Sequence, residues 1–283
     1  MNLINLMHKA FFGGDWYVGY RKKNSKEDYT IIPGFSKKWI ADPFLFEYEN
    51  EHYLFVEYME NKKGEIAYFK FINGVPIFQK VIVSEKYHLS YPCVFEYNGK
   101  VYMCPESADN NTIDLYYANK FPDDWKKIAT LTHGRYLDST VLELNDDLYL
   151  FSYISKNKFF ELHCFKMDIE KLSVEKKSAK KFVKNIGRPA GKFQIKDGIL
   201  LRPSQDCSRM YGEKIIWNNV TQFKNYRIEE DIYSNWDVKA INPMFERIHT
   251  YNSDSKYEVV DFFKERFDIT RPINLIRKKM KQK

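Results

Sequence analysis

Three acidic side chains of this 283-residue sequence interrupt apolar stretches. Asp42 follows the tripeptide WIA, Asp138 follows the dipeptide YL, and Glu106 stands in CPES directly after an apolar run. A charge in such a place costs free energy unless it is used or paired. Carboxyl groups that converge on one pocket suit glycosidic chemistry, in which one is the base or nucleophile, one is the acid, and a third shifts a neighbour's pKa. We therefore predict Asp42, Glu106 and Asp138 as catalytic residues. The structural alternative is that each Asp caps a turn and Glu106 is a hydrogen-bonded strut.

An internal repeat of roughly 50 residues indicates the elements that position these acids. Three segments align without gaps: DPFLFEYENEHYLFVE from Asp42, YPCVFEYNGKVYMCPE from Tyr91 and DSTVLELNDDLYLFSY from Asp138. A looser copy, GRPAGKFQIKDGILLRPSQD, begins at Gly187. Each segment is an apolar strand, a turn and a second apolar strand, and Asn-Gly or Asp-Gly in such a turn predicts a hairpin.

Further strand-like sequence follows each hairpin, so each repeat provides up to four strands. Four-stranded units at this period are typical of propeller blades, whereas consecutive hairpins in a β-sandwich are the alternative. A fifth unit is faint, around residues 234–263, and the N-terminal sequence WYVGYR is a candidate to complete it. We predict an all-β fold, a five-bladed β-propeller with short helical N- and C-terminal extensions. The expected divisions are an amphipathic segment over residues 1–14, the propeller over 15–268 and a basic tail over 269–283.

In a propeller the innermost strands line a central funnel, and residues at the blade starts gather around its mouth. The repeat therefore predicts that distant residues converge. The starts of the first strands carry Asp42, Tyr91, Asp138 and Arg188, and the ends of the second strands carry Glu57, Glu106, Tyr153, Gln205 and Asp206.

Cations and hydrogen-bonding groups stand at the same repeat ends and predict a substrate site. A site for a neutral sugar needs few guanidinium groups, whereas a phosphate is bound well by arginine, which offers two parallel donors. These residues therefore favour an anionic ligand, although Arg188 has the alternative of simply pairing with Asp138 or Asp42. The predicted substrate-binding residues are His88, Tyr91, Arg188, Lys192, Arg202, Gln205, Asp206, Tyr211 and His249.

Other common site signatures are absent from the sequence. It has no Gly-rich phosphate loop, no G-x-S-x-G and no H-E-x-x-H, and its four cysteines form no C-x-x-C pair. We therefore expect no cofactor, no metal and no disulfide. The N-terminus lacks the features of a secretion signal, and no apolar run reaches the ~20 residues of a membrane span, so we expect a cytoplasmic protein.

The charge distribution argues against a nucleic-acid-binding protein. The net charge is +7, but the last 13 residues contribute six basic side chains and no acid, which makes a basic tail rather than a basic face. Leu3, Leu6, Met7, Ala10 and Phe11 have helical spacing near the other end. Both ends either pack on the propeller or contact an anionic membrane peripherally, at the inner face of the cell membrane.

The motifs also resemble known families. WIADPF around Asp42 is similar to the opening of the five-bladed arabinanase and β-xylosidase clan of glycoside hydrolases. The resemblance implies that Asp42 is the catalytic base and that Asp138 modulates the pKa of a neighbouring acid. The glutamate that is the catalytic acid in that clan lies in a later blade than the one that carries Glu106. HLSYPCVFEYNGKVYMCPES, YLDSTVLELNDDLYLFS, GRPAGKF, LLRPSQDCSRMYG and HTYN resemble the propeller domain at the N-terminus of plant glucosamine inositolphosphorylceramide transferase, over residues 16–275 or so. Similar stand-alone proteins are associated with bacterial surface-polysaccharide assembly.

Three functions are compatible with these features. The first is a glycosyltransferase of bacterial cell-surface polysaccharide biosynthesis, which passes a sugar from a phosphorylated donor to a lipid-linked or glycan acceptor. The second is a glycoside hydrolase that uses the same carboxyl groups on a neutral glycan. The third is a non-catalytic glycan-binding propeller, because a fold alone does not decide a function.

Overall fold

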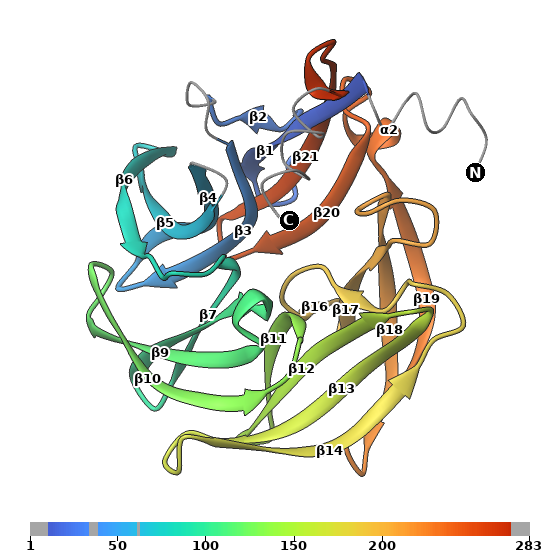
Figure 1. Ribbon diagram of the computed structural model, residues 1–283. Coiled ribbons are helices and arrows are strands. Elements are labelled where there is room, and N and C mark those ends of the chain that lie inside the picture. Colours follow the sequence, from blue (N-terminus) through green and yellow to red (C-terminus); the bar gives the residue numbers. More distant parts are fainter. Residues whose placement is uncertain (1–10, 34–38, 61–62, 273–283) are drawn as a thin grey trace.

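The computed structural model describes residues 11–33, 39–60 and 63–272. Five separate sheets surround a common centre (Figure 1), which confirms the predicted five-bladed propeller. Blades one to three are formed by consecutive antiparallel strands that run outward from the centre: β3 (Trp39–Tyr48), β4 (Glu51–Glu60), β5 (Lys63–Ile72) and β6 (Val75–Val83); β7 (Ser90–Tyr97), β8 (Lys100–Ser107), β9 (Thr112–Lys120) and β10 (Asp124–His133); β11 (Leu137–Leu144), β12 (Asp147–Lys156), β13 (Phe159–Asp168) and β14 (Ser173–Lys181).

Blade four has a divided inner strand. β15 (Arg188–Pro189) and β16 (Gln194–Lys196) both pair with β17 (Ile199–Asp206), and β18 (Lys214–Lys224) and β19 (Arg227–Asp237) complete the sheet. A short helix, α2 (Val238–Ile241), leads to blade five. The faint fifth unit expected from residue 234 therefore begins later, at Arg247, because residues 227–237 still belong to blade four.

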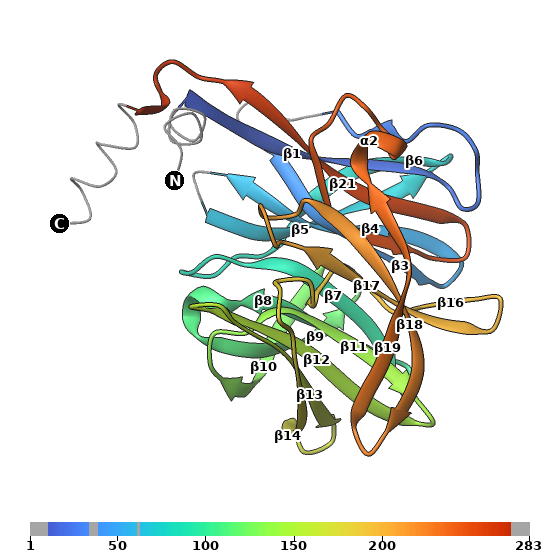
Figure 2. The same ribbon diagram turned by 90° about the vertical axis from the view of Figure 1, so that its right-hand side faces the viewer.

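The N-terminal strand closes the ring, as the sequence predicted. Blade five consists of β20 (Arg247–Ser253), β21 (Tyr257–Phe267), β1 (Phe12–Lys22) and β2 (Thr30–Ile31). Figure 2 shows the start of β1 beside the end of β21 at one edge of the molecule, where Phe12 pairs with Phe267. The expected N-terminal helix falls largely on residues 1–10, which lie outside the described residues, as do residues 273–283 of the expected C-terminal extension.

Turn chemistry explains why the blades form where they do. Asn73-Gly74, Asn98-Gly99 and Asp197-Gly198 all have positive φ at both residues. A type I′ turn requires this conformation and matches the twist of the flanking strands. The hairpins are thus specified locally, and the layers between blades then bury aromatic side chains, such as Phe55 beside Tyr68 and Trp125. Each buried aromatic side chain contributes about 1.5–3 kcal/mol, so the blades form a rigid frame.

Candidate active site

A repeated backbone irregularity aims side chains toward the centre. Asp42, Tyr91 and Asp138, at the starts of β3, β7 and β11, are held at φ of 48°, 45° and 47°. The strand register shifts at each of these residues, and β20 has the same shift at His249 and Thr250. A β-bulge redirects a side chain out of the normal alternation, and non-glycine residues at positive φ are strained. The bulges therefore present equivalent residues of four blades to one place.

Asp42 is buried and accepts hydrogen bonds from residues of blades two and five. Its Oδ1 accepts a hydrogen bond from Thr250 Oγ1 at 2.8 Å, and its Oδ2 accepts one from the Tyr91 backbone N–H at 3.2 Å. The Asp42 backbone N–H donates to Asp261 Oδ2 at 3.0 Å. His249 lies between the two acids, with Nε2 3.5 Å from Asp42 Oδ1 and Nδ1 2.6 Å from Asp261 Oδ2. The position and orientation of Asp42 are therefore fixed from several sides.

Glu106 and Asp138 share one guanidinium group. Arg188 donates through Nε to Asp138 Oδ2 at 2.5 Å and through Nη2 to Asp138 Oδ1 at 3.1 Å and Glu106 Oε2 at 3.3 Å. Glu106 Oε2 also accepts the Asp138 backbone N–H at 3.0 Å. Gln205 Nε2 donates to Asp138 Oδ2 at 2.6 Å. The pairing of Arg188 with Asp138, which was the structural alternative for this arginine, is thus present.

Burial raises the pKa values of two of these acids. Burial, together with the charges of Asp138 and neighbouring acids, raises the pKa of Asp42 to about 7, against the opposing charge of His249. Burial and the charge of Asp138 raise the pKa of Glu106 well above its usual range, although Arg188 opposes the shift. Groups poised near neutral pH are suited to proton transfer. The site therefore offers two carboxyl groups whose pKa values are raised, that of Asp42 to about 7.

The rim of this site is formed by a histidine, a tyrosine and a tryptophan. His88 Nε2 lies 3.0 Å from Glu57 Oε1, and the imidazole is partly exposed. Tyr211, which is 40% exposed, makes edge contacts with His249 and Trp16, and the Arg188 guanidinium lies over its ring. Trp16 stacks on His249 with ring centroids 3.9 Å apart. We call Asp42, Glu57, His88, Glu106, Asp138, Arg188, Tyr211, His249 and Asp261 the mouth cluster.

The remaining predicted residues lie apart from the rim or are already engaged. Tyr91 is fully buried, and its hydroxyl contacts Thr140 Oγ1 at 2.8 Å and the Gly191 N–H at 2.6 Å. Lys192 lies deeper, where its Nζ donates to the Leu45 carbonyl at 3.0 Å. Asp206 is bound to Ser208 in a turn. The structure therefore does not bring Tyr91, Lys192 and Asp206 to the rim, although the repeat placed their backbones near it.

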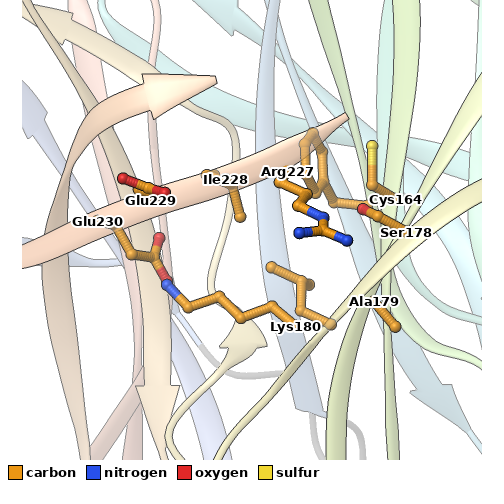
Figure 3. Close-up of a pocket in the computed structure, with 10 residues that line it drawn as sticks. Cys164, Ser178, Ala179, Lys180, Arg227, Ile228, Glu229 and Glu230 are labelled. Atoms are coloured by element: carbon orange, nitrogen blue, oxygen red, sulfur yellow. The ribbon is translucent and has the colours of Figure 1, made fainter. Parts of the chain in front are cut away.

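Arg202 points away from the mouth cluster, into the boundary between blades three and four. Its Nε and Nη2 bind both oxygens of Glu230 at 2.8 and 2.7 Å, and its Nη1 donates to the Gly187 carbonyl at 3.2 Å. A cavity of about 440 Å³ opens there, and Figure 3 shows Lys180 reaching Glu230 across it. The charge of Glu230 is thus shared between two cations. Arg202, which we had expected to contact a phosphate, is a structural partner of Glu230.

One group in the described part of the chain could hold a metal ion. Asp42, His249 and Asp261 each offer a ligand atom, and these atoms lie within 4.8 Å of one another. Both Asp261 oxygens, however, already accept backbone N–H groups: Oδ1 from His249 and Thr250, and Oδ2 from Asp42. These hydrogen bonds and the charge of His249 can therefore compensate the negative charge of Asp42 and Asp261 from within the protein.

Two members of the site escaped sequence reasoning. Asp261 interrupts the apolar run VVDFF, which is the same signal that identified Asp42 and Asp138. It was overlooked because blade five lacks a recognisable repeat. Trp16 comes from the opposite end of the chain and reaches the site only because β1 completes blade five. No local pattern could have shown that contact.

Known proteins share this sequence and fold. The family model described as "Glucosamine inositolphosphorylceramide transferase 1, N-terminal" matches residues 29–246, which confirms the resemblance indicated by the motifs. Glucosamine inositolphosphorylceramide transferase 1 of Oryza sativa subsp. indica is 30% identical over 209 residues, which are 70% of this chain and 27% of the relative. That of Arabidopsis thaliana is 30% identical over 194 residues, 64% of this chain and 25% of the relative. The chain thus spans about a quarter of the length of these curated relatives.

Two solved structures with the same fold are described as glycoside hydrolases. Zg3597, a family 117 glycoside hydrolase of Zobellia galactanivorans, superposes with a TM-score of 0.57 and 11% identity, over 87% of this chain and 90% of its own. A thermostable family-43 glycoside hydrolase gives a TM-score of 0.60 and 13% identity, over 81% and 89%. At such low identity these structures establish the fold alone.

Proposed function

This chain belongs to the family of the N-terminal domain of glucosamine inositolphosphorylceramide transferase 1, and from this premise we propose that it is a glycosyltransferase of bacterial cell-surface polysaccharide biosynthesis. It transfers a sugar from a phosphorylated donor to a lipid-linked or glycan acceptor bound at the mouth cluster. The observation that carries the proposal is the convergence of Asp42, Glu106 and Asp138 from three blades, with the pKa values of Asp42 and Glu106 raised.

The chemistry follows from the positions of the acids. Ionised Asp42 removes the proton of an acceptor hydroxyl, whose oxygen then bonds to the anomeric carbon of the sugar while the bond from that carbon to the donor phosphate breaks. Protonated Glu106 donates a hydrogen bond to the departing or incoming oxygen. Burial and the charge of Asp138 raise the pKa of Glu106 and so favour its protonated form, although the Arg188 guanidinium opposes this shift. The partly exposed His88 is the mouth residue best placed to meet a phosphate oxygen.

A glycoside hydrolase is the second candidate, and one specific observation favours it. Hydrolysis needs an acid to protonate the leaving oxygen and a second carboxyl as base or nucleophile. Glu106 with its raised pKa and Asp42 supply that pair. The arginines predicted to bind a phosphate give the transferase less support, because Arg188 is bound to Asp138, and Arg202 is bound to Glu230 away from the mouth cluster.

Incubation with activated donors distinguishes these functions. We expect UDP-glucose, UDP-N-acetylglucosamine, UDP-galactose or GDP-mannose to stabilise the wild-type protein, by about 2.7 kcal/mol at a hundred times the dissociation constant. The stabilising donor should transfer its labelled sugar to an oligosaccharide acceptor, detected by mass spectrometry. Release of nitrophenol from synthetic furanosides or pyranosides, without any donor, would identify a hydrolase instead. Sugar binding without turnover of either substrate type would identify a binding module.

We further propose that the protein is cytoplasmic and touches the inner face of the membrane through its basic tail. No helix in the described ranges is long and apolar enough to span a bilayer. β1 and β21 pair along their length in blade five, so Phe12 and Phe267 lie at the same edge of the molecule. Each basic residue near an anionic surface contributes about 1 kcal/mol. Those beyond the described residues are Arg277, Lys278, Lys279, Lys281 and Lys283.

Vesicle flotation tests this contact. The wild-type protein should float with vesicles that contain 30% phosphatidylglycerol and stay behind with pure phosphatidylcholine, because the attraction is electrostatic. Replacement of the five basic residues of 277–283 by glutamine should abolish flotation without lowering the unfolding temperature. Equal flotation of the variant would show that the tail is not the attachment.

A further inference from the structure

A second cavity lies between blades four and five, toward the C-terminal end of β20. It measures about 460 Å³, and its walls include the end of β1, the end of β20, β16 and the outer part of β19. β20 joins the two places: it carries His249 beside Asp42 and Ser253 in the cavity wall. At about 3.3 Å per residue these positions are roughly 13 Å apart along the strand. None of the mouth cluster lines this cavity.

Aromatic side chains form one wall of this cavity. The rings of Trp217, Trp236 and Tyr251 contact one another edge-on, with centroids 5.1–5.2 Å apart. Two further apolar side chains line the cavity and are exposed: Tyr233 at 47% and Ile195 at 81%. The indole N–H of Trp217 is buried and has no hydrogen-bond partner among the described residues. Exposed apolar side chains around a hollow commonly mark a binding site.

Polar groups and charges of both signs also line the cavity. Arg21 Nε donates to Glu258 Oε1 at 2.5 Å, and Glu258 Oε2 accepts the Tyr251 hydroxyl at 3.0 Å. Ser253 Oγ donates to Gln194 Oε1 at 2.7 Å. The cationic lining residues Arg21, Lys23 and Lys196 are offset in part by the anionic Glu258 and Asp197. A strongly charged ligand would find little net attraction here.

We propose that this cavity is a second glycan-binding site, which takes one or two neutral sugar residues of an oligosaccharide. A pyranose has an apolar C–H face that packs on an aromatic ring and a rim of hydroxyls that both donate and accept hydrogen bonds. The cavity offers both surfaces side by side: the ring wall around Trp236 and Tyr233, and the amide and hydroxyl groups of Gln194 and Ser253. The site requires no chemistry at Asp42, and it would hold a glycan chain at a fixed distance from the mouth.

Saturation-transfer NMR with cellotetraose, chitotetraose and mannotetraose tests the proposal on the full chain. We expect at least one of them to receive saturation at its ring C–H protons, and Trp236→Ala to lower this signal at least fivefold. Tyr233→Ala, a change at an exposed rim position, should lower it without affecting the fold. Ile232→Ala is the matched control, because Ile232 neighbours Tyr233 on β19, is 60% exposed and does not line the cavity.

Asp42→Asn separates this site from the proposed active site. The signal should survive in Asp42→Asn and in any preparation that shows no transferase activity. A signal that is lost in Asp42→Asn but unchanged in Trp236→Ala and Tyr233→Ala would place all binding at the mouth cluster and overturn the proposal. The absence of saturation transfer to all three tetrasaccharides would overturn it as well.

Discussion

Replacement of Asp42 by asparagine should lower turnover about 10²–10⁴-fold while the protein stays folded. Asparagine keeps the size of the side chain and an oxygen that can accept from Thr250 or from the Tyr91 backbone. It cannot take up a proton from an acceptor hydroxyl. The measurement is the initial rate of sugar transfer or glycoside hydrolysis by wild type and variant at equal concentration. Asp206→Asn is the control, since Asp206 is also a buried acid at a strand end but binds Ser208.

The same variant should change how stability depends on pH. Asp42 has a pKa of about 7 in the folded protein, above the ordinary value of 3.8 for an aspartate. Between these values the folded wild-type protein holds a proton that the unfolded chain has released, so its stability falls as pH rises through this window. Asp42→Asn removes this contribution, and the variant should gain stability relative to wild type from pH 4 to pH 7 in urea titrations. Parallel curves would show that Asp42 ionises normally, and full turnover would remove it from the mechanism.

Arg188→Ala should destabilise the fold by about 3–5 kcal/mol near neutral pH. The substitution removes the Arg188 donors and leaves the Asp138 carboxylate with the Gln205 amide, close to the carboxyl of Glu106. Removal of one partner of a buried ion pair is costly because the other charge stays buried. Urea unfolding of wild type and variant measures the loss. Arg209→Ala serves as the control, because Arg209 forms an exposed pair with Glu213 and its loss should leave the unfolding midpoint unchanged.

A double variant decides whether charge is the cause. Arg188→Ala/Asp138→Asn should recover most of the stability lost in Arg188→Ala, since no unpaired charge remains. An equal loss of stability in the single and the double variant would mean that Arg188 stabilises the fold by packing.

The sequence predicted the blades because each hairpin is encoded locally. Asn98-Gly99 and Asp197-Gly198 fix turns whose geometry needs no distant partner. The mouth acids Asp42 and Asp138 were also predictable, because an acid in an apolar strand needs a partner or a use. The spacing of the repeat then placed their backbones together, and the bulges confirm that equivalence.

The partners of side chains were harder to predict from the repeat. Arg202 and Gln205 are three residues apart on β17 and so lie on opposite faces of the strand: Arg202 binds Glu230 on β19, whereas Gln205 binds Asp138. The repeat gives the position of a residue along a strand, but it does not show which charged group of a neighbouring strand the side chain will meet. Blade five was faint for a different reason: β1 and β21 are separated by most of the chain, and pairing between them leaves no short-range pattern.

Closure of the ring by β1 also sets the order in which the site can be completed during synthesis. Asp42 leaves the ribosome early, but its partners Thr250, His249 and Asp261 belong to the last blade. At about 5–20 residues per second the ribosome needs roughly 10–45 seconds to pass from Asp42 to Phe267. For most of that interval the acid has none of these three neighbours. A chain interrupted before blade five therefore lacks the groups that position Asp42, and any activity that depends on Asp42 should require synthesis through β21.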